Sequence, residues 1–198
     1  MEINNFLKIQ SLLDFSEPNT FYFIQILKRR KENPEMKTGV RVIDNFYIYT
    51  IDDLENLKGK IIEACILYNA RAYINVNRLD LERIALHTSK KIIDLVIQGD
   101  YRAVKNAYPS VCGSHSSESE KRWVVDIDTK DHEYIMGIIR YIGNLHAKIP
   151  KSNYKILDWL ETKNGFHIIS NPFNLKEFKD TYPEIDVHKS SPTILYIP

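Results

Sequence analysis

The heptapeptide RWVVDID, residues 122–128, places two carboxylates, Asp126 and Asp128, two positions apart in an apolar run. Side chains alternate between the faces of a β-strand, so a strand here would project both carboxylates from one face and Val125 and Ile127 from the other. Two adjacent like charges repel, and half-burying them is costly unless a cation lies between them. A divalent metal ion with oxygen ligands meets that need. Alternatively, Asp128 caps a following helix and Asp126 pairs with a lysine.

The charge of the whole chain limits how it could bind a polyanion. Its 198 residues include 27 Lys and Arg against 26 Asp and Glu, a net charge of +1. A contact with nucleic acid must therefore come from a local patch rather than from the overall field. The basic cluster Lys28–Lys31 is a candidate for such a patch, although basic loops are usually only solvated.

Cysteine content and hydropathy predict a cytoplasmic protein. The two cysteines, Cys65 and Cys112, imply no disulfide framework and favour a reducing interior. The chain shows no signal peptide, and apolar runs such as Ile61–Tyr68 are too short to span a membrane. Abundant Ile, Lys, Asn and Tyr indicate an AT-rich genome. We therefore expect a microbial cell or a virus-infected host cell, with a phage or mobile element as the source, and no membrane partner.

Residues 1–108 have the pattern of an N-terminal αβ sub-domain. A capping box, Thr50 with Asp53, predicts the start of a helix that runs to about Tyr68. The strand expected at 70–77 has one apolar face and one polar face, and the polar face includes Arg71 and Asn75. These polar side chains could form hydrogen bonds to a ligand. The remaining expected elements are a helix at 3–14, strands at 21–27 and 40–49, and helices at 79–97 and 101–108.

Residues 122–198 predict a second sub-domain after a flexible, Ser-rich connection at 109–121. Their expected order is strand, helix, strand, strand, helix, strand, which is the RRM-like or ferredoxin-like βαββαβ arrangement. The whole chain is therefore expected to be α+β.

The ferredoxin-like topology places its first and third strands side by side and its fourth strand next to the first. His167, on the expected third strand FHIIS, should then lie beside Asp126 or Asp128 on an open face, with the helices on the opposite face. Lys163 and Gly165 share the side of His167 at a period of two if that strand extends backward. Asp186, at the edge of the fourth strand, would complete a triad of carboxylates with Asp126 and Asp128, and Glu184 could take its place.

These residues resemble the motifs of the archaeo-eukaryotic primases and primase-polymerases. In that family a DxD or DxE pair lies on the first strand, a basic-x-small-x-His motif on the third, and an acid near the last. The corresponding residues here are Asp126 and Asp128, then KNGFH at 163–167, then Asp186. The family also carries an αβ sub-domain before the acidic motif, which residues 1–108 could supply.

The resemblance implies a metal-dependent nucleotidyltransferase that acts in DNA replication. Two Mg²⁺ or Mn²⁺ ions would be held by Asp126, Asp128 and Asp186, the catalytic carboxylates. The nucleotide would be bound by Lys163, Gly165 and His167, with Arg71 and Asn75 as further candidates for contacting the nucleotide or the template. The implied partners are nucleoside triphosphates, a DNA or RNA template, and other replication proteins.

Two other functions remain open on the sequence. Clustered acids with a lysine can also activate water against a phosphodiester, as in a metal-dependent nuclease. A catalytically inactive module that binds nucleotides or nucleic acid is the non-enzymatic alternative, although an RRM-like RNA platform would expose aromatic residues where this chain has Asp and His. The sequence also leaves open the choice between ribonucleotides and deoxyribonucleotides, and between starting and extending a primer.

Overall fold

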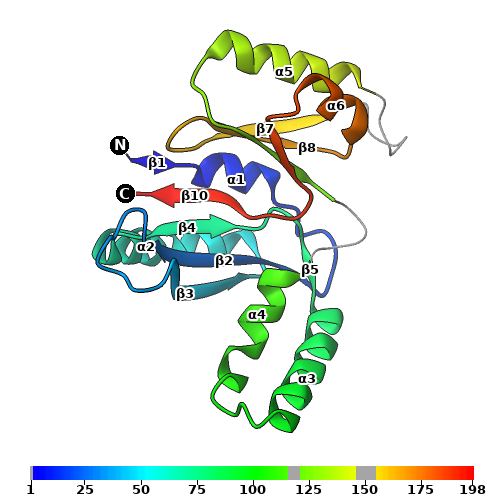
Figure 1. Ribbon diagram of the computed structural model, residues 1–198. Coiled ribbons are helices and arrows are strands. Elements are labelled where there is room, and N and C mark those ends of the chain that lie inside the picture. The colour runs from blue at the N-terminus through cyan, green and yellow to red at the C-terminus, as the bar shows by residue number, and fades with distance from the viewer. Residues whose placement is uncertain (1, 116–120, 146–154) are drawn as a thin grey trace.

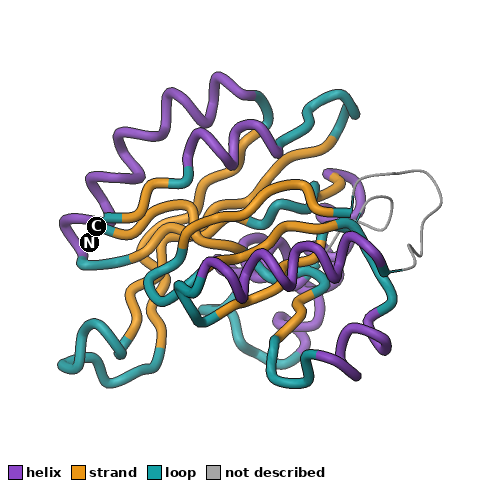
Figure 2. Tube along the Cα trace, turned by 90° about the horizontal axis from the view of Figure 1, so that it is seen from above, coloured by secondary structure: helices purple, strands orange, loops and turns teal. Residues whose placement is uncertain are grey.

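The computed structural model describes residues 2–115, 121–145 and 155–198. These residues form a mixed α+β structure with two antiparallel β-sheets and six α-helices, which confirms the expected α+β class. Seen from above, the strands lie together in the middle and helices line the outer sides (Figure 2). Within the described residues, no helix is both long and apolar enough to cross a membrane.

The first sheet is built from both ends of the chain. Its strand order is β1 (Ile3–Asn4), β10 (Thr193–Ile197), β4 (Arg71–Ile74), β2 (Thr20–Arg29) and β3 (Val40–Ile48), and β5 (Leu79–Asp80) also pairs with β2. Apolar residues of β2, β3 and β4 pack against α2 (Ile51–Tyr68). The predicted capping box is confirmed: Asp53 N–H donates to Thr50 Oγ1 at 3.2 Å and Thr50 N–H donates to Asp53 Oδ2 at 2.9 Å.

Strand β10 corrects the expected grouping of residues 122–198 in one sub-domain, because it lies in the first sheet between β1 and β4. Its sequence TILYI is buried at every position. A strand that is apolar on both faces suits the interior of a sheet, and this pattern did not say which sheet. The pairing brings the N- and C-terminal segments side by side (Figure 1).

The second sheet carries RWVVDID in its interior. Its strands are β6 (Trp123–Ile127), β7 (Ile156–Glu161), β8 (Phe166–Ser170) and β9 (Asp186–His188), in the order β7-β8-β6-β9. The expected pairing of β6 with both β8 and β9 is confirmed. Helices α5 (His132–Asn144) and α6 (Leu175–Thr181) cover one face, where Trp123, Val125 and Ile127 join their apolar cluster (Figure 1).

The opposite face of the second sheet is not open as expected. Val124, Leu160 and Ile169 on this face are buried in one cluster with Leu195 of β10 and with helix α1 (Phe6–Leu12). The first sheet and α1 therefore cover much of the face from which the carboxylates project, and the acids open into a cleft between the two sheets instead.

Two buried asparagines connect the sheets. Asn5 Nδ2 donates to Glu161 O at 2.9 Å and to Ile194 O at 3.1 Å, which links β7 to β10. Asn77, just after β4, donates to Arg122 O at 3.0 Å and accepts from Arg122 N–H at 2.6 Å, just before β6. These paired backbone contacts fix the spacing of the two sheets at separate points.

Residues 101–114 differ from the expected helix at 101–108 and from the expected flexible connection at 109–121. A 3₁₀ turn at Val104–Asn106 leads into α4 (Ala107–Ser114), and α3 (Leu81–Ile97) precedes them. Pro109 lies in the first turn of α4, where a missing N–H costs nothing. Val111 and Cys112 are buried against Phe21 and Phe23, which explains the helix.

Some expectations fall outside the described residues. Residues 116–120 of the expected connection belong to this group. The sequence of the second half also predicts a helix at 135–149 and a strand at 154–161, and residues 146–149 and 154 of these lie outside the described residues as well.

Candidate functional site

Asp126 and His167 lie directly opposite each other on β6 and β8. His167 Nε2 lies 3.3 Å from Asp126 Oδ1, as the sequence-based topology predicted. The other ring nitrogen, Nδ1, forms a 2.8 Å hydrogen bond with Thr193 Oγ1 of β10. Residues from both sheets therefore hold the imidazole, and the imidazole in turn orients the carboxylate.

The hydrogen bond with His167 lowers the pKa of Asp126 below its ordinary value. Burial acts in the opposite direction and raises this pKa, while the nearby His188 lowers it further. Asp126 is therefore an ionised, half-buried carboxylate at neutral pH, a combination that is common at functional sites.

A cleft of about 340 Å³ opens between the two sheets beside this pair, a volume in the range of ligand sites. The second sheet and its β7–β8 turn contribute Val124, Asp126, Asp128, Thr162, Lys163, Asn164, His167 and His188. The first sheet and the segments leading to it contribute Arg29, Lys31, Arg71, Tyr73, Ser191, Pro192 and Ile194.

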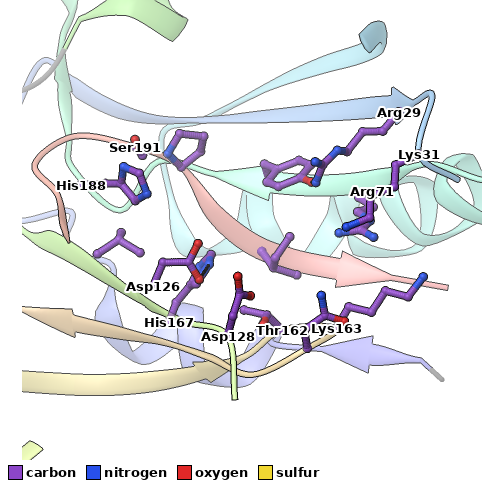
Figure 3. A pocket seen from close by; sticks show the side chains of 15 residues that line it. Arg29, Lys31, Arg71, Asp126, Asp128, Thr162, Lys163, His167, His188 and Ser191 are labelled. Atoms are coloured by element: carbon purple, nitrogen blue, oxygen red, sulfur yellow. Dashed lines mark hydrogen bonds and ion pairs between the residues drawn. The ribbon is translucent and has the colours of Figure 1, made fainter. Parts of the chain in front are cut away.

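The charges in the cleft are separated (Figure 3). Arg29, Lys31 and Arg71 lie at one end, with Lys163 across from them, and Asp126 lies farther along with the imidazole of His167. An anion with several charges, reaching from the basic end to the carboxylates, would match this arrangement if a cation bridged it to the acids.

At the basic end, each arginine is held by a neighbour. Arg71 Nη2 lies 2.5 Å from Glu32 Oε1, and Arg29 Nη1 donates to Tyr73 OH at 3.1 Å. The hydrogen bond with Tyr73 raises the pKa of Arg29. Both guanidinium groups are therefore positioned before any ligand arrives. Arg71 was a candidate on the sequence, and the structure places it in the cleft.

Lys163 and Gly165 lie in the turn before β8 rather than on the strand itself. Lys163 lines the cleft. Gly165 has a structural reason to be glycine, because a Cβ atom there would lie 1.8 Å from Ile127 O and 2.7 Å from Thr129 N. The turn can approach the end of β6, and hence Asp128, only without a side chain at this position.

Asp186 pairs with Asp126 in the register of β9 and β6, as predicted, but its carboxylate is 77% exposed and lies 3.9 Å from Lys179 Nζ. It lines an adjacent cleft of about 220 Å³ that also includes Asp126, Asp128 and Glu184. Glu184 accepts a 2.6 Å hydrogen bond from Tyr134 OH. Both candidates for the third acid thus lie around one opening that shares Asp126 and Asp128 with the main cleft.

Asn75 does not line the main cleft. Its side-chain oxygen accepts from Asn77 N–H at 3.0 Å, and it lines a separate, small pocket with Gln25 and Gly113. This position is close to the cleft along the chain, because Tyr73 lines both spaces.

Tyr73 belongs to the same polar face of the expected strand 70–77 as Arg71, whereas the sequence does not assign His188, Ser191 or Thr193 to the site. Among these three, His188 has a local signal, because it follows Asp186 at the period of two that puts both side chains on one strand face. Thr193 contacts His167 because β10 pairs in the first sheet, and no local sequence pattern indicates that pairing.

Comparisons with protein-family models, curated proteins and solved structures found no match to this chain. We therefore assign function from the chemistry of the cleft.

The residues of the cleft can be tested as ligands for a divalent cation. Asp126 and Asp128 project from one strand face and offer hard oxygen donors, which suits Mg²⁺ or Mn²⁺. In the described parts of the chain, no group of three His, Cys, Asp or Glu side chains is placed to hold a metal. Mg²⁺ is usually bound by one or two carboxylates together with substrate phosphates. The carboxylate pair fits that kind of site, with Asp186 as the neighbouring acid.

Proposed function

We propose that the protein is a primase- or polymerase-like nucleotidyltransferase, which transfers nucleotides from triphosphates onto a 3′-hydroxyl on a nucleic-acid template. The observation that carries this proposal is the cleft in which the ionised Asp126, with Asp128 beside it, faces a fixed group of cations. A nucleoside triphosphate carries negative charge that Lys163, Arg29 and Arg71 would offset, and a divalent cation would join its phosphates to the carboxylates.

The proposal includes the finer fold assignment. The order β7-β8-β6-β9, with α5 and α6 on one face, supports an RRM-like sub-domain for the catalytic half. The sheet that contains β2, β3 and β4 supports an N-terminal αβ sub-domain that supplies the basic wall. Both features agree with the primase and primase-polymerase resemblance.

In the proposed reaction, the 3′-oxygen forms a bond to the α-phosphorus while the bond from that phosphorus to the bridging oxygen of the β-phosphate breaks. Pyrophosphate leaves, and the hydroxyl proton passes to solvent. Two divalent ions, when bound by Asp126 and Asp128 with Asp186 as the neighbouring acid, would stabilise the attacking and leaving oxygens.

The protein's own side chains position the reactants. Lys163, Arg29 and Arg71 would bind the β- and γ-phosphates and offset the charge that develops on pyrophosphate. His167 holds Asp126 through Nε2 while Thr193 holds Nδ1, so the carboxylate is oriented before substrate arrives. Such orientation reduces the reorganisation needed at the moment of reaction.

Primer extension with Asp126→Asn tests the proposal. The wild-type protein, supplied with Mg²⁺ or Mn²⁺, a primed template and nucleoside triphosphates, should lengthen the primer. Asp126→Asn keeps the shape but removes the charge and should abolish extension. Asp94→Asn, an exposed change of the same kind on α3, is the matched control and should extend normally.

Other outcomes would contradict this function. Equal primer extension by wild-type and Asp126→Asn protein would show that the reaction does not require the Asp126 carboxylate. Degradation of the template that requires Asp126 would identify a metal-dependent nuclease. Triphosphate binding without extension or degradation, seen as a raised melting temperature with a divalent ion, would identify an inactive binding module.

A further inference from the structure

The β2–β3 hairpin, residues 28–41, concentrates positive charge in a chain that is almost neutral overall. It contains six basic and two acidic residues, a net of +4, whereas the whole chain has a net of +1. The basic residues are Lys28, Arg29, Arg30, Lys31, Lys37 and Arg41.

The two acids of the hairpin are already paired. Glu32 pairs with Arg71 of β4, and Glu35 Oε1 lies 3.2 Å from Lys28 Nζ. Arg30, Lys37 and Arg41 are exposed and lie outside the lining of the cleft, whereas Arg29 and Lys31 line it. The hairpin therefore forms a basic path that begins on the surface and continues into the cleft.

Buried hydrogen bonds fix the turn of the hairpin. Asn33, only 4% exposed, donates through Nδ2 to Arg29 O at 3.1 Å and to Asn69 O at 3.0 Å. Asn69, whose left-handed backbone ends α2, donates back to Glu32 O at 3.3 Å. A basic loop that serves only to be solvated needs no such support, whereas a positioned loop loses less entropy on binding.

Arg71, beneath the hairpin, has a donor that the protein does not use. The side chain is 10% exposed, and its Nε is buried without a hydrogen-bond partner among the described residues. A buried donor left unsatisfied costs about 1–3 kcal/mol. Arg71 lines both the main cleft and a smaller pocket of about 130 Å³. An anionic oxygen at this place would satisfy the donor.

We propose that the β2–β3 hairpin binds the phosphate backbone of the template strand as it approaches the cleft. This inference rests on the proposed function, because the strand is the one copied at Asp126 and Asp128. Arg30, Lys37 and Arg41 bind successive phosphates outside the cleft, and Arg71 binds anionic oxygen within it. An extended polyanion can follow both the hairpin and the cleft, whereas a flat membrane surface cannot enter the cleft.

Salt-dependent binding of a fluorescent oligodeoxythymidylate, measured by anisotropy without divalent ions or nucleotides, tests the hairpin. The variant Arg30→Ala/Lys37→Ala/Arg41→Ala removes three exposed cations. Each phosphate contact to a single strand contributes about 0.7 to the slope of log K against log salt, so the slope should become shallower by about 2. The control Lys90→Ala/Arg102→Ala/Arg140→Ala removes the same charge from exposed positions elsewhere and should keep the wild-type slope.

An equal change in slope for both triple variants would overturn the inference, because binding would then depend on net charge alone. The hairpin cations would in that case serve to keep the edge strand β3 from pairing with other chains. Binding to phosphatidylserine vesicles but not to the oligonucleotide would also overturn it. Circular dichroism and melting temperature establish that both variants remain folded.

The failure of this inference can be told apart from the failure of the proposed function. If Asp126→Asn abolishes extension but the hairpin variant binds the oligonucleotide normally, the hairpin assignment is wrong and the enzymatic one stands. If no protein extends a primer but the hairpin variant shows the shallower slope, the hairpin binds nucleic acid and the proposed reaction is wrong.

Discussion

Gly165→Ala should destabilise the protein although it adds a single methyl group. The new Cβ would lie 1.8 Å from Ile127 O, and ordinary contact begins at 3.4 Å. The turn and the end of β6 would therefore have to separate by about 1.6 Å. Both neighbours are backbone atoms, so no flexible side chain can move aside.

The separation also weakens the turn's own hydrogen bonds, Thr162 N–H to Gly165 O at 2.9 Å and Gly165 N–H to Thr162 Oγ1 at 3.1 Å. Overpacking costs about 1–3 kcal/mol, and each lost hydrogen bond costs about 1 kcal/mol. We expect a loss of about 3 kcal/mol in the free energy of unfolding. With a urea m-value of about 2 kcal/mol/M, the midpoint should fall by roughly 1.5 M.

Urea denaturation followed by circular dichroism measures this midpoint. Gly137→Ala is the matched control, because nothing lies within 4 Å of a Cβ at this position of α5, and alanine in a helix interior should stabilise by about 1 kcal/mol. A Gly165→Ala midpoint equal to that of the wild-type protein would refute the close approach of the turn to β6.

Three further predictions concern single side chains. The pKa of Asp126 is lower in the folded protein than its unfolded value of 3.8, so the ionised carboxylate stabilises the fold above that pH. This stabilisation is lost as the pH falls through the folded pKa. The urea midpoints of wild-type and Asp126→Asn protein should therefore differ at neutral pH and converge in acid. Thr193→Val removes the partner of His167 Nδ1 and should cost about 1–2 kcal/mol, with a changed imidazole ¹⁵N spectrum; an unchanged spectrum would contradict the hydrogen bond. Thr50→Ala should cost about 1 kcal/mol by thermal unfolding, and Thr50→Ser much less, because only the former loses the N-cap oxygen.

The local pattern of the sequence was sufficient for the second sheet. The apolar run of RWVVDID with its two acids at a spacing of two, and the apolar pattern of FHIIS, predicted both strands, and the expected pairing put Asp126 beside His167. The start of α6 is equally local, since the Asn174 side chain accepts from Glu177 N–H three residues further on. These features depend on contacts between neighbouring elements, where period and turn residues carry the information.

The contacts between the sheets were not predictable in the same way. Nothing in TILYI distinguishes a strand of the second sheet from an interior strand of the first, and Thr193 reaches His167 only because β10 joins the first sheet. The basic cluster at Lys28–Lys31 was visible in the sequence, but its place opposite the carboxylates follows from packing between distant segments. Such long-range placement leaves no periodic signal.

The position of β10 has a kinetic consequence. The strands of the second sheet all lie between residues 123 and 188, whereas β10 pairs Ile197 with Ile3 and Thr193 with Ile74. Pairings of high sequence separation form slowly, because the closure entropy is paid before the contacts are made. The second sheet can thus assemble early, but Thr193 reaches His167 only when β10 inserts between β1 and β4. The oriented carboxylate would then be among the last features of the native state to form, and a partly folded chain would lack it.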